Sequence, residues 1–321
     1  MSFTRDNIPA RRVAQFLGLV GIAVGIVAVS AMFTTAPINP LIAIASFVPL
    51  FLVVTGLGLL VSLVFRRWFL LTVSVVVVGV ATVVVAPLYV ANSDTVDGPS
   101  LRVMQANLMF GAADPASLVE TVRERDVDVL TVQELTETLA TKLEDRGLEQ
   151  LLQYQYLIPD ESGGGGAGIY SRYPLTDTRE LDGYGPTNLV ATVDFTTPFT
   201  LVAVHPGPAV VTPPDIWTTE LDNLRQQLAA FAATDSPVVV SGDFNTTYLH
   251  KQFRDLLDAG YADAADQLGS GIVPTYPADK QFPAIVGIDH VLTKDARAQS
   301  LERVTITGSD HHGLIVDVAI G

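Results

Sequence analysis

Acidic, amide and imidazole side chains recur in this sequence where apolar runs come to an end. They are Asn107 in LRVMQANL, Glu134 in VDVLTVQEL, His205 in LVAVHP, Asp243 and Asn245 in PVVVSGDFN, Asp289 in IDHVL, and Asp310 and His311 in GSDHHG. Taken singly, each has a structural explanation, because Asn and Asp form turns after strands and a histidine often packs in a core. Together they form a candidate site.

The residue types in this set can hold a cation and move a proton. Glu134 offers a carboxylate suited to Mg²⁺, which keeps several waters and needs only one or two protein carboxylates, and Asn107 could add a carbonyl ligand or orient the substrate. His311 is the strongest candidate for an acid/base residue, because imidazole titrates near neutrality. A carboxylate behind it would select one tautomer and favour the protonated form.

The elements that must position these side chains are short strands with helices between them. Strand-like runs, rich in β-branched residues, cover residues 101–107, 127–132, 168–171, 189–195, 199–204, 238–240, 285–292, 304–307 and 314–320. Helices are predicted at residues 115–125, 136–145, 218–233 and 251–259, the first with Asp114 as N-cap and Pro115 at the first helical position. Many strands with interspersed helices predict stacked sheets covered by helices.

The first part of the chain is different, and its composition predicts three transmembrane helices. The mean hydropathy of the whole chain is +0.37, and long apolar runs occupy residues 13–33, 41–65 and 68–90. Each run exceeds the roughly 18 to 20 residues that cross a bilayer as a helix. The first could instead be a secretory signal, but its apolar run is longer than a signal core and two further runs follow at once.

Basic residues in the short loops predict the orientation of these helices. Arg5, Arg11 and Arg12 precede the first run, Arg66 and Arg67 separate the second from the third, and the loop at residues 34–40 has no basic residue. The positive-inside rule then places the N-terminus and the Arg66–Arg67 turn in the cytoplasm. Three crossings would deliver the rest of the chain to the extracytoplasmic side of the cell membrane.

We therefore expect a membrane domain at residues 1–92 and a catalytic domain at residues 93–321. Fourteen of the 19 basic residues and 32 of the 34 acidic residues follow position 94, so the second domain carries a charge of about −18. Such a field disfavours tight binding of nucleic acid, which remains the less favoured partner. The chain has no cysteine, which excludes disulfides and Cys-ligated zinc.

The polar motifs, taken together and in this order, resemble those of the endonuclease/exonuclease/phosphatase superfamily, whose fold is DNase I-like. The resemblance covers roughly residues 101–321 and includes GIYSRYPL, similar to the family's central strand, and FRDLLDAGYADA followed by TYP, similar to a stretch in bacterial members. The sequence departs from the family at Gly313, where Pro is frequent, and at Tyr248-Leu249, where Pro-Trp is frequent. The chain thus resembles a bacterial, membrane-anchored member.

The resemblance implies a fold and a set of roles. The fold would be three N-terminal transmembrane helices followed by an α/β (α+β) domain of two stacked mixed sheets flanked by helices. Glu134, Asn107 and Asp310 would form the metal region, with Mg²⁺, or alternatively Mn²⁺, as cofactor. The catalytic roles implied are His311 as acid/base, Asp289 as its carboxylate partner, Asp243 to align or activate the attacking water, and Asn245 and His205 to hold the phosphate.

This assignment of roles includes neither His290 nor His312, and it leaves zinc as an alternative to Mg²⁺. His290 and His312 each adjoin an assigned residue, and on a strand the neighbouring side chain points to the opposite face. A zinc site built from Asp289, His290, Asp310, His311 and His312 is the alternative, but the His-x-x-x-His or Glu-x-x-His spacing on a helix is absent.

The function expected from these features is that of a membrane-anchored, Mg²⁺-dependent phosphoesterase, a phosphodiesterase or phosphatase. Its substrate would be an extracytoplasmic phosphate ester. The anchor, which holds the domain close to the bilayer, and the acidic surface favour a phospholipid, a polyprenyl-linked phosphate or a small phosphate ester. The first alternative is an exported endonuclease or exonuclease. The second is a non-catalytic binding protein that retains the fold.

Overall fold

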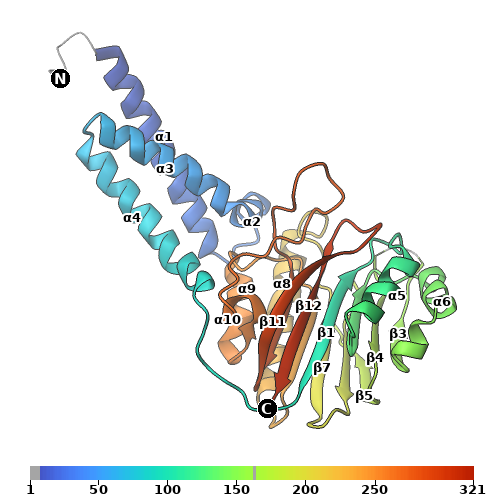
Figure 1. Ribbon diagram of the computed structural model, residues 1–321. Coiled ribbons are helices and arrows are strands. Elements are labelled where there is room, and N and C mark those ends of the chain that lie inside the picture. Colours follow the sequence, from blue (N-terminus) through green and yellow to red (C-terminus); the bar gives the residue numbers. More distant parts are fainter. Residues whose placement is uncertain (1–7, 162–163) are drawn as a thin grey trace. The chain divides into compact units, whose positions relative to one another are not determined.

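The computed structural model describes residues 8–161 and 164–321, and the chain divides into two compact units (Figure 1). The first unit is made of residues up to Pro87, together with Leu249–Lys251. The second runs from Leu88 to Gly321 apart from that short segment. The first unit consists of apolar helices, and the second contains both sheets and all of the candidate site.

Among its residues from Ile8 onward, the first unit has two helices long and apolar enough to cross a membrane, and a bent pair that could make a third span. The helices are α1 (Ile8–Met32), α2 (Asn39–Ser46), α3 (Val48–Val64) and α4 (Trp68–Val85), followed by the short 3₁₀ helix η2 (Ala86–Tyr89). The run at residues 41–65, expected as one straight helix, is bent by 77° between α2 and α3. The break falls at Phe47, two residues before Pro49, and a proline in the first turn starts a helix well but cannot continue one.

Small residues bring α1 and α3 into close contact. A Cβ placed on Gly21 would lie 3.0 Å from the Cα of Gly58, and one on Gly25 would lie 2.6 Å from the Oγ1 of Thr55. The hydroxyls of Thr55 and Ser62 donate to carbonyls four residues earlier, so these buried groups are satisfied within their helix. Close packing through small residues, with internally satisfied hydroxyls, is typical of helices in membranes.

The second unit is built around two six-stranded sheets in the described residues. The first sheet has the order β11 (Ala296–Thr305), β12 (His312–Ile320), β1 (Ser100–Asn107), β2 (Val129–Gln133), β4 (Ala167–Ser171) and β3 (Tyr154–Ile158). The second has the order β5 (Leu175–Glu180), β6 (Leu189–Val193), β7 (Phe199–Val204), β8 (Val238–Asp243), β10 (Asp289–Lys294) and β9 (Ala262–Asp263). Both sheets are mixed.

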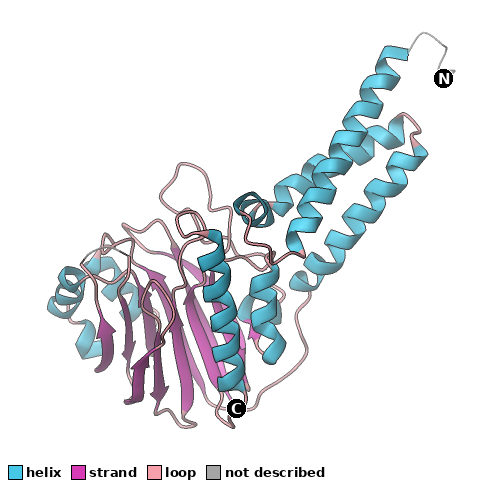
Figure 2. Cartoon of the chain, turned by 180° about the vertical axis from the view of Figure 1, so that it is seen from behind, coloured by secondary structure: helices cyan, strands magenta, loops and turns pink. Residues whose placement is uncertain are grey.

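The sheets pack face to face, with helices on their outer faces (Figure 2). The core between the sheets includes Val103 and Val316 from the first and Leu201 and Val239 from the second, all fully buried. The helices and 3₁₀ turn of this unit are α5 (Pro115–Glu124), α6 (Glu137–Asp145), α7 (Leu148–Leu151), α8 (Pro214–Ala232), α9 (Lys251–Leu256), η3 (Leu257–Ala259) and α10 (Ala264–Gln267). Helices α5 and α6 cover the first sheet and α8 covers the second.

Pairing between strands brings the ends of β1, β2, β7 and β8 to one side of the sandwich. β1 pairs in parallel with β2, and β7 pairs in parallel with β8. β12 and β10 run antiparallel to β1 and β8, so these two strands begin where β1 and β8 end. In Figure 1, this side lies opposite the C-terminus, where β12 ends beside the start of β1.

The expected two-sheet architecture is confirmed, while several boundaries differ. β10 begins at Asp289, because the residues before it lie outside the sheet. One of them, Val286, forms only an isolated bridge with Tyr276. The strand expected at residues 304–307 is the end of the longer β11, which lies at the edge of its sheet and contains Arg297, Glu302 and Arg303. Strands β3 and β5 are also edge strands with exposed polar residues, which weakens the apolar signal in their sequences.

Replacement of Leu201 by alanine tests the core between the sheets. We expect Leu201→Ala to lower the free energy of unfolding of the second unit by about 2 to 5 kcal/mol, because the side chain is fully buried and its removal leaves a cavity. The chain has two tryptophans, and in a Trp68→Phe background the buried Trp217 reports unfolding of this unit in urea. Exposed Thr196→Ala is the control, and an equal shift in both variants would contradict the assigned core.

Candidate active site

The structure brings all the predicted site residues to the side of the sandwich where β1, β2, β7 and β8 end. Asn107 and Asp243 are the last residues of β1 and β8, and Glu134 and His205 follow β2 and β7 directly. Asp289 begins β10, and His311 immediately precedes β12. In the β8–β10 pair, Asp289 lies directly opposite Asp243. Side chains up to about two hundred positions apart in the sequence thus lie close together, because strand ends of both sheets meet at one edge.

The backbone at this edge adopts unusual conformations. Glu134 and Asn245 have φ angles of 57° and 48°, in the left-handed region that non-glycine residues rarely occupy. Before Asp243, Gly242 leaves no room for a side chain, since a Cβ there would lie 2.1 Å from the carbonyl oxygen of Val204. Such conformations cost energy and cluster at functional sites, where the surrounding fold holds them in place.

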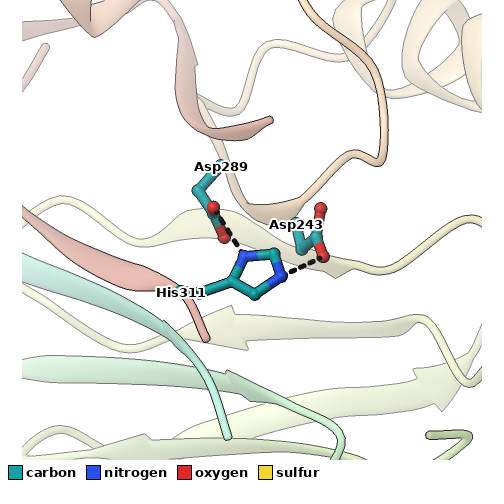
Figure 3. Close-up of side chains that lie close together, drawn as sticks. All are labelled: Asp243, Asp289 and His311. Carbon is teal, nitrogen blue, oxygen red and sulfur yellow. Dashed lines mark hydrogen bonds and ion pairs between the residues drawn. The ribbon is translucent and has the colours of Figure 1, made fainter. Parts of the chain in front are cut away.

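His311 lies between two buried carboxylates (Figure 3). Its Nδ1–H donates to Oδ2 of Asp289 at 2.9 Å, and its Nε2 lies 3.7 Å from Oδ2 of Asp243. Burial acts against the charged imidazole, but the carboxylates of Asp289 and Asp243 outweigh it and raise the pKa of His311 to about 10. His311 is therefore protonated on both ring nitrogens, and its hydrogen bond to Asp289 sets the orientation of the ring.

Asp243 is held ionised at neutral pH in spite of its burial. Burial raises the pKa of its carboxyl to about 6, while the charge of His311 and the backbone N–H of Asn245 act in the opposite direction. The Asn245 N–H donates to Oδ1 at 2.8 Å, so Oδ2 is the oxygen directed at the imidazoles. This oxygen is positioned to accept a proton or to align a water molecule.

Asn107 connects Asp243 with Glu134. Its Nδ2 donates to Oε1 of Glu134 and to Oδ2 of Asp243, both at 3.1 Å. Its Oδ1 accepts from the backbone N–H of Met109 at 2.9 Å. In this arrangement the amide group orients the two carboxylates, and its oxygen faces the backbone. The carbonyl ligation considered from the sequence would require the amide to turn.

Glu134 is a largely buried carboxylate that no lysine or arginine neutralises within the described residues. Its Oε2 accepts from the backbone N–H of Phe110 at 2.7 Å, and its side chain is 13% exposed. Burial is the main reason that its pKa is raised, and the negative charge of Asp310 adds to the rise. A bound divalent cation would offset both effects, so the chemistry of Glu134 and nearby Asp310 fits a hard metal ion.

The imidazole of His205 completes the group on the side of the second sheet. Its Nε2 lies 3.8 Å from Oδ2 of Asp243 and 3.9 Å from Oε1 of Glu134. Burial lowers the pKa of this histidine, so the ring is neutral at physiological pH. Its Nδ1 has no hydrogen-bond partner among the described residues, and a buried polar atom of this kind is available to a ligand.

The remaining predicted residues lie around this centre. Nδ2 of Asn245 donates to the carbonyl of Pro206 at 2.9 Å, which ties the turn after β8 to the turn after β7. His290 points away from His311 and pairs with Asp263 at 2.7 Å beside the ring of Phe253. His312 is partly exposed, and its backbone N–H donates to the carbonyl of Thr275. Both histidines lie outside the centre, as their strand positions predicted.

A further residue, Gln105, contacts the site and was not identified from the sequence. Its Nε2 donates to Oδ1 of Asp289 at 2.6 Å and to Oε1 of Gln133 at 2.9 Å. Asp289 is therefore bound by the first sheet through Gln105 and by His311 through its other oxygen. The available signal was a glutamine in the middle of an apolar strand, two residues before Asn107 and on the same face.

Removing the charge of Asp289 tests this arrangement. For a reaction catalysed at this site, we expect Asp289→Asn to lower kcat by about 10² to 10⁴-fold, because the amide no longer favours the protonated imidazole of His311. The measurement is kcat and KM of the purified full chain. Asp235→Asn, at an exposed position before β8, is the matched control. Activity retained in Asp289→Asn would contradict the pairing.

One family model matches the chain, that of the Endonuclease/Exonuclease/phosphatase family, over residues 104–311. The match begins in β1 before Asn107 and ends at His311, so it includes every predicted site residue. A comparison with curated protein sequences gave no match.

Solved structures with the same fold come from distant organisms. A structure of D. rerio TDP2 complexed with a single-strand DNA product has a TM-score of 0.54 and 18% identity, and the match covers 68% of this chain and 98% of that one. A mannosyl-6-phosphatase from Bacteroides thetaiotaomicron has a TM-score of 0.52, 14% identity and coverage of 68% and 100%. An endonuclease/exonuclease/phosphatase from Beutenbergia cavernae has values of 0.53, 19%, 69% and 72%. At these identities, the similarity establishes the DNase I-like fold.

Proposed function

Because this chain belongs to the endonuclease/exonuclease/phosphatase family, we propose that it is a membrane-anchored, divalent-metal-dependent phosphoesterase with an extracytoplasmic active site. The observation that carries this proposal is His311 held between Asp289 and Asp243, beside the unneutralised carboxylate of Glu134. Phosphate-ester hydrolysis requires neutralised phosphoryl oxygens, an aligned water and a group that handles its proton. The site contains a candidate for each task.

In the proposed mechanism, the residues of this chain bind and orient the ester. Asp243, ionised and directed at the centre, aligns the attacking water and takes its proton. Protonated His311, with Asp289 behind it, donates a hydrogen bond to a phosphoryl oxygen or a proton to the leaving group. Neutral His205 and Asn245 lie beside the same centre and would contact the remaining phosphoryl oxygens.

Glu134 and Asp310 would hold the metal ion, with Mg²⁺ or Mn²⁺ as the best match to oxygen ligands. Asn107 orients the Glu134 carboxylate. When bound, the ion would neutralise charge on the phosphoryl group. Zinc is disfavoured, because the chain has no cysteine and lacks the His-x-x-x-His or Glu-x-x-His spacing of a helical zinc site.

The membrane location is supported by α1 and α4, by the small-residue packing of α1 against α3, and by the arginine distribution. α3 alone has 17 residues, about one bilayer core in length. If α2 and α3 together make one crossing, three crossings place the active site outside the cytoplasm. The acidic second domain and the nearby bilayer favour a small or lipid-linked phosphate ester.

A nuclease is the second candidate, since the TDP2 structure contains a DNA product. Against it stands the charge of about −18 on the chain after position 94. A non-catalytic binding protein is less well supported, because it would not need the buried Asp–His–Asp arrangement, whose assembly requires desolvating two carboxylates.

Metal removal tests the proposed chemistry. EDTA should abolish hydrolysis of a generic phosphomonoester or phosphodiester by the full chain, and added Mg²⁺ or Mn²⁺ should restore it, because no lysine or arginine among the described residues pairs with the buried carboxylate of Glu134. Release of the product alcohol or nitrophenol is the measurement. Activity that is unaffected by the chelator would disprove the metal role.

The same assay distinguishes the two candidate functions when DNA, RNA, phospholipid and sugar phosphate are compared at several salt concentrations. A nuclease that contacts several phosphates would lose affinity steeply as salt rises, whereas cleavage of a small or membrane-borne ester would change little.

A reporter fused after Gly321 tests the topology. Alkaline phosphatase, which is active only after export, should be active in this fusion, and a cytoplasmic reporter at the same site should be silent. This outcome follows from three crossings with the arginines inside. The opposite pattern would mean that α2 and α3 do not cross as one span.

A further inference from the structure

Three loops around the candidate active site expose large apolar side chains. They follow β1 (residues 108–113), follow β7 (residues 206–213) and precede β10 (residues 281–287), and we call them the rim loops. Their exposed apolar residues are Phe110, Val210, Val211, Phe282 and Ile285. Val210 and Val211 are 93% and 77% exposed, close to the values for an unfolded chain, so they pack against almost nothing in the second unit.

Two of the rim loops begin within hydrogen-bond distance of site residues. In the first, the backbone N–H of Phe110 donates to Oε2 of Glu134 at 2.7 Å. In the second, the carbonyl of Pro206 accepts from Nδ2 of Asn245 at 2.9 Å. These loops therefore adjoin the same site, one from the side of the first sheet and one from the side of the second.

The third rim loop is connected to the site through His311. The backbone N–H of Ile285 donates to the carbonyl of Tyr276 at 2.9 Å, and the Tyr276 ring lies 4.9 Å from the imidazole of His311, centroid to centroid. The backbone N–H of Ala278, just before this loop, donates to the carbonyl of Asp310. All three loops thus adjoin residues of one site.

The rim loops carry no charge in a domain that is otherwise strongly acidic. Residues 108–113, 206–213 and 281–287 contain no Asp, Glu, Lys, Arg or His, although the chain after position 94 has a charge of about −18. A surface that binds a polyanion would be expected to carry Lys and Arg here. An uncharged, apolar surface bordered by polar ones instead matches the interfacial region of a bilayer, where apolar side chains leave water.

The connection to the apolar helices favours a bilayer as the occupant of this surface. Only Ala86 and Pro87 separate the end of α4 from Leu88, which belongs to the second unit. The Leu88 carbonyl accepts from the N–H of Gly271 at 2.8 Å, and the N–H of Asn92 donates to the carbonyl of Gln267 at 3.0 Å. The start of the connection is thus bound to the second unit, and only two residues of chain separate it from the last residue of α4.

We propose that the rim loops dock on the surface of a lipid bilayer, with Val210, Val211, Phe282 and Phe110 entering its interfacial region. The active site then receives phosphate groups at the level of the lipid headgroups, which makes a membrane-borne phosphate ester the substrate class. This substrate assignment rests on the proposed phosphoesterase function, whereas the docking itself does not.

The absence of cysteine allows a direct test with the full chain. Single variants Val211→Cys, Phe282→Cys and Asp235→Cys are labelled with an environment-sensitive fluorophore and reconstituted into phosphatidylcholine vesicles with or without a lipid that carries a doxyl quencher. Asp235 is the control, because it is exposed at the start of β8, at the far end of that strand from Asp243. Labels at 211 and 282 should emit at shorter wavelength and be quenched several-fold more strongly than the label at 235.

A label at position 211 that is as weakly quenched as the control would overturn the docking. The quenching result does not depend on catalysis, so it decides the inference even if the proposed function fails.

The double variant Val210→Ser/Val211→Ser provides the second arm. Hydrolysis of a phospholipid in the vesicle should fall on the order of tenfold, since two valines no longer leave water, while hydrolysis of a soluble nitrophenyl phosphodiester should stay unchanged. Equal loss on both substrates, or no loss on either, would contradict the docking. If neither wild type nor variant cleaves either substrate, the proposed function fails, and the quenching result still decides the docking.

Discussion

The structure of the site depends on burying two carboxylates around one imidazole. Asp243 and Asp289 are 1% and 2% exposed, and two carboxylates this close would repel each other strongly without a positive charge between them. His311 supplies that charge, and its raised pKa reflects the interaction. Because the stabilisation is mutual, the loss of any one of the three groups leaves an uncompensated charge or a mis-set tautomer in a site that excludes most water.

Holding these groups together requires both sheets. Asp243 and Asp289 come from neighbouring strands of the second sheet, while His311 and Gln105 come from the first. The sheets are joined by the apolar core and by a hydrogen bond between the hydroxyls of Thr131 and Ser241 at 2.8 Å. The packing of the sandwich therefore controls the Asp289–His311 distance. Small changes in the core would shift the side chains of the site.

The remaining features concern access to this centre. Three independent properties of the chain bear on it: the uncharged rim loops, the acidic charge elsewhere and the short connection after α4. Each is consistent with the proposed substrate at a membrane surface. The same fold occurs in a mannosyl-6-phosphatase and in TDP2, whose structure contains a single-strand DNA product. Substrate choice must therefore be decided by such loops, since the sandwich is common to all.

The sequence alone predicted the family, the two-sheet architecture and the apolar helices, because these follow from local patterns: β-branched content in strands, long uncharged runs, and short motifs at strand ends. It did not reveal the bend between α2 and α3, the edge strands β3 and β5, or the contact of Gln105 with Asp289. Which carboxylate lies against which nitrogen of His311, and which loops surround them, depended on the pairing of β8 with β10 and on the stacking of the sheets. These are contacts between residues up to about two hundred positions apart, and no local pattern records the distance between two side chains that only packing brings together.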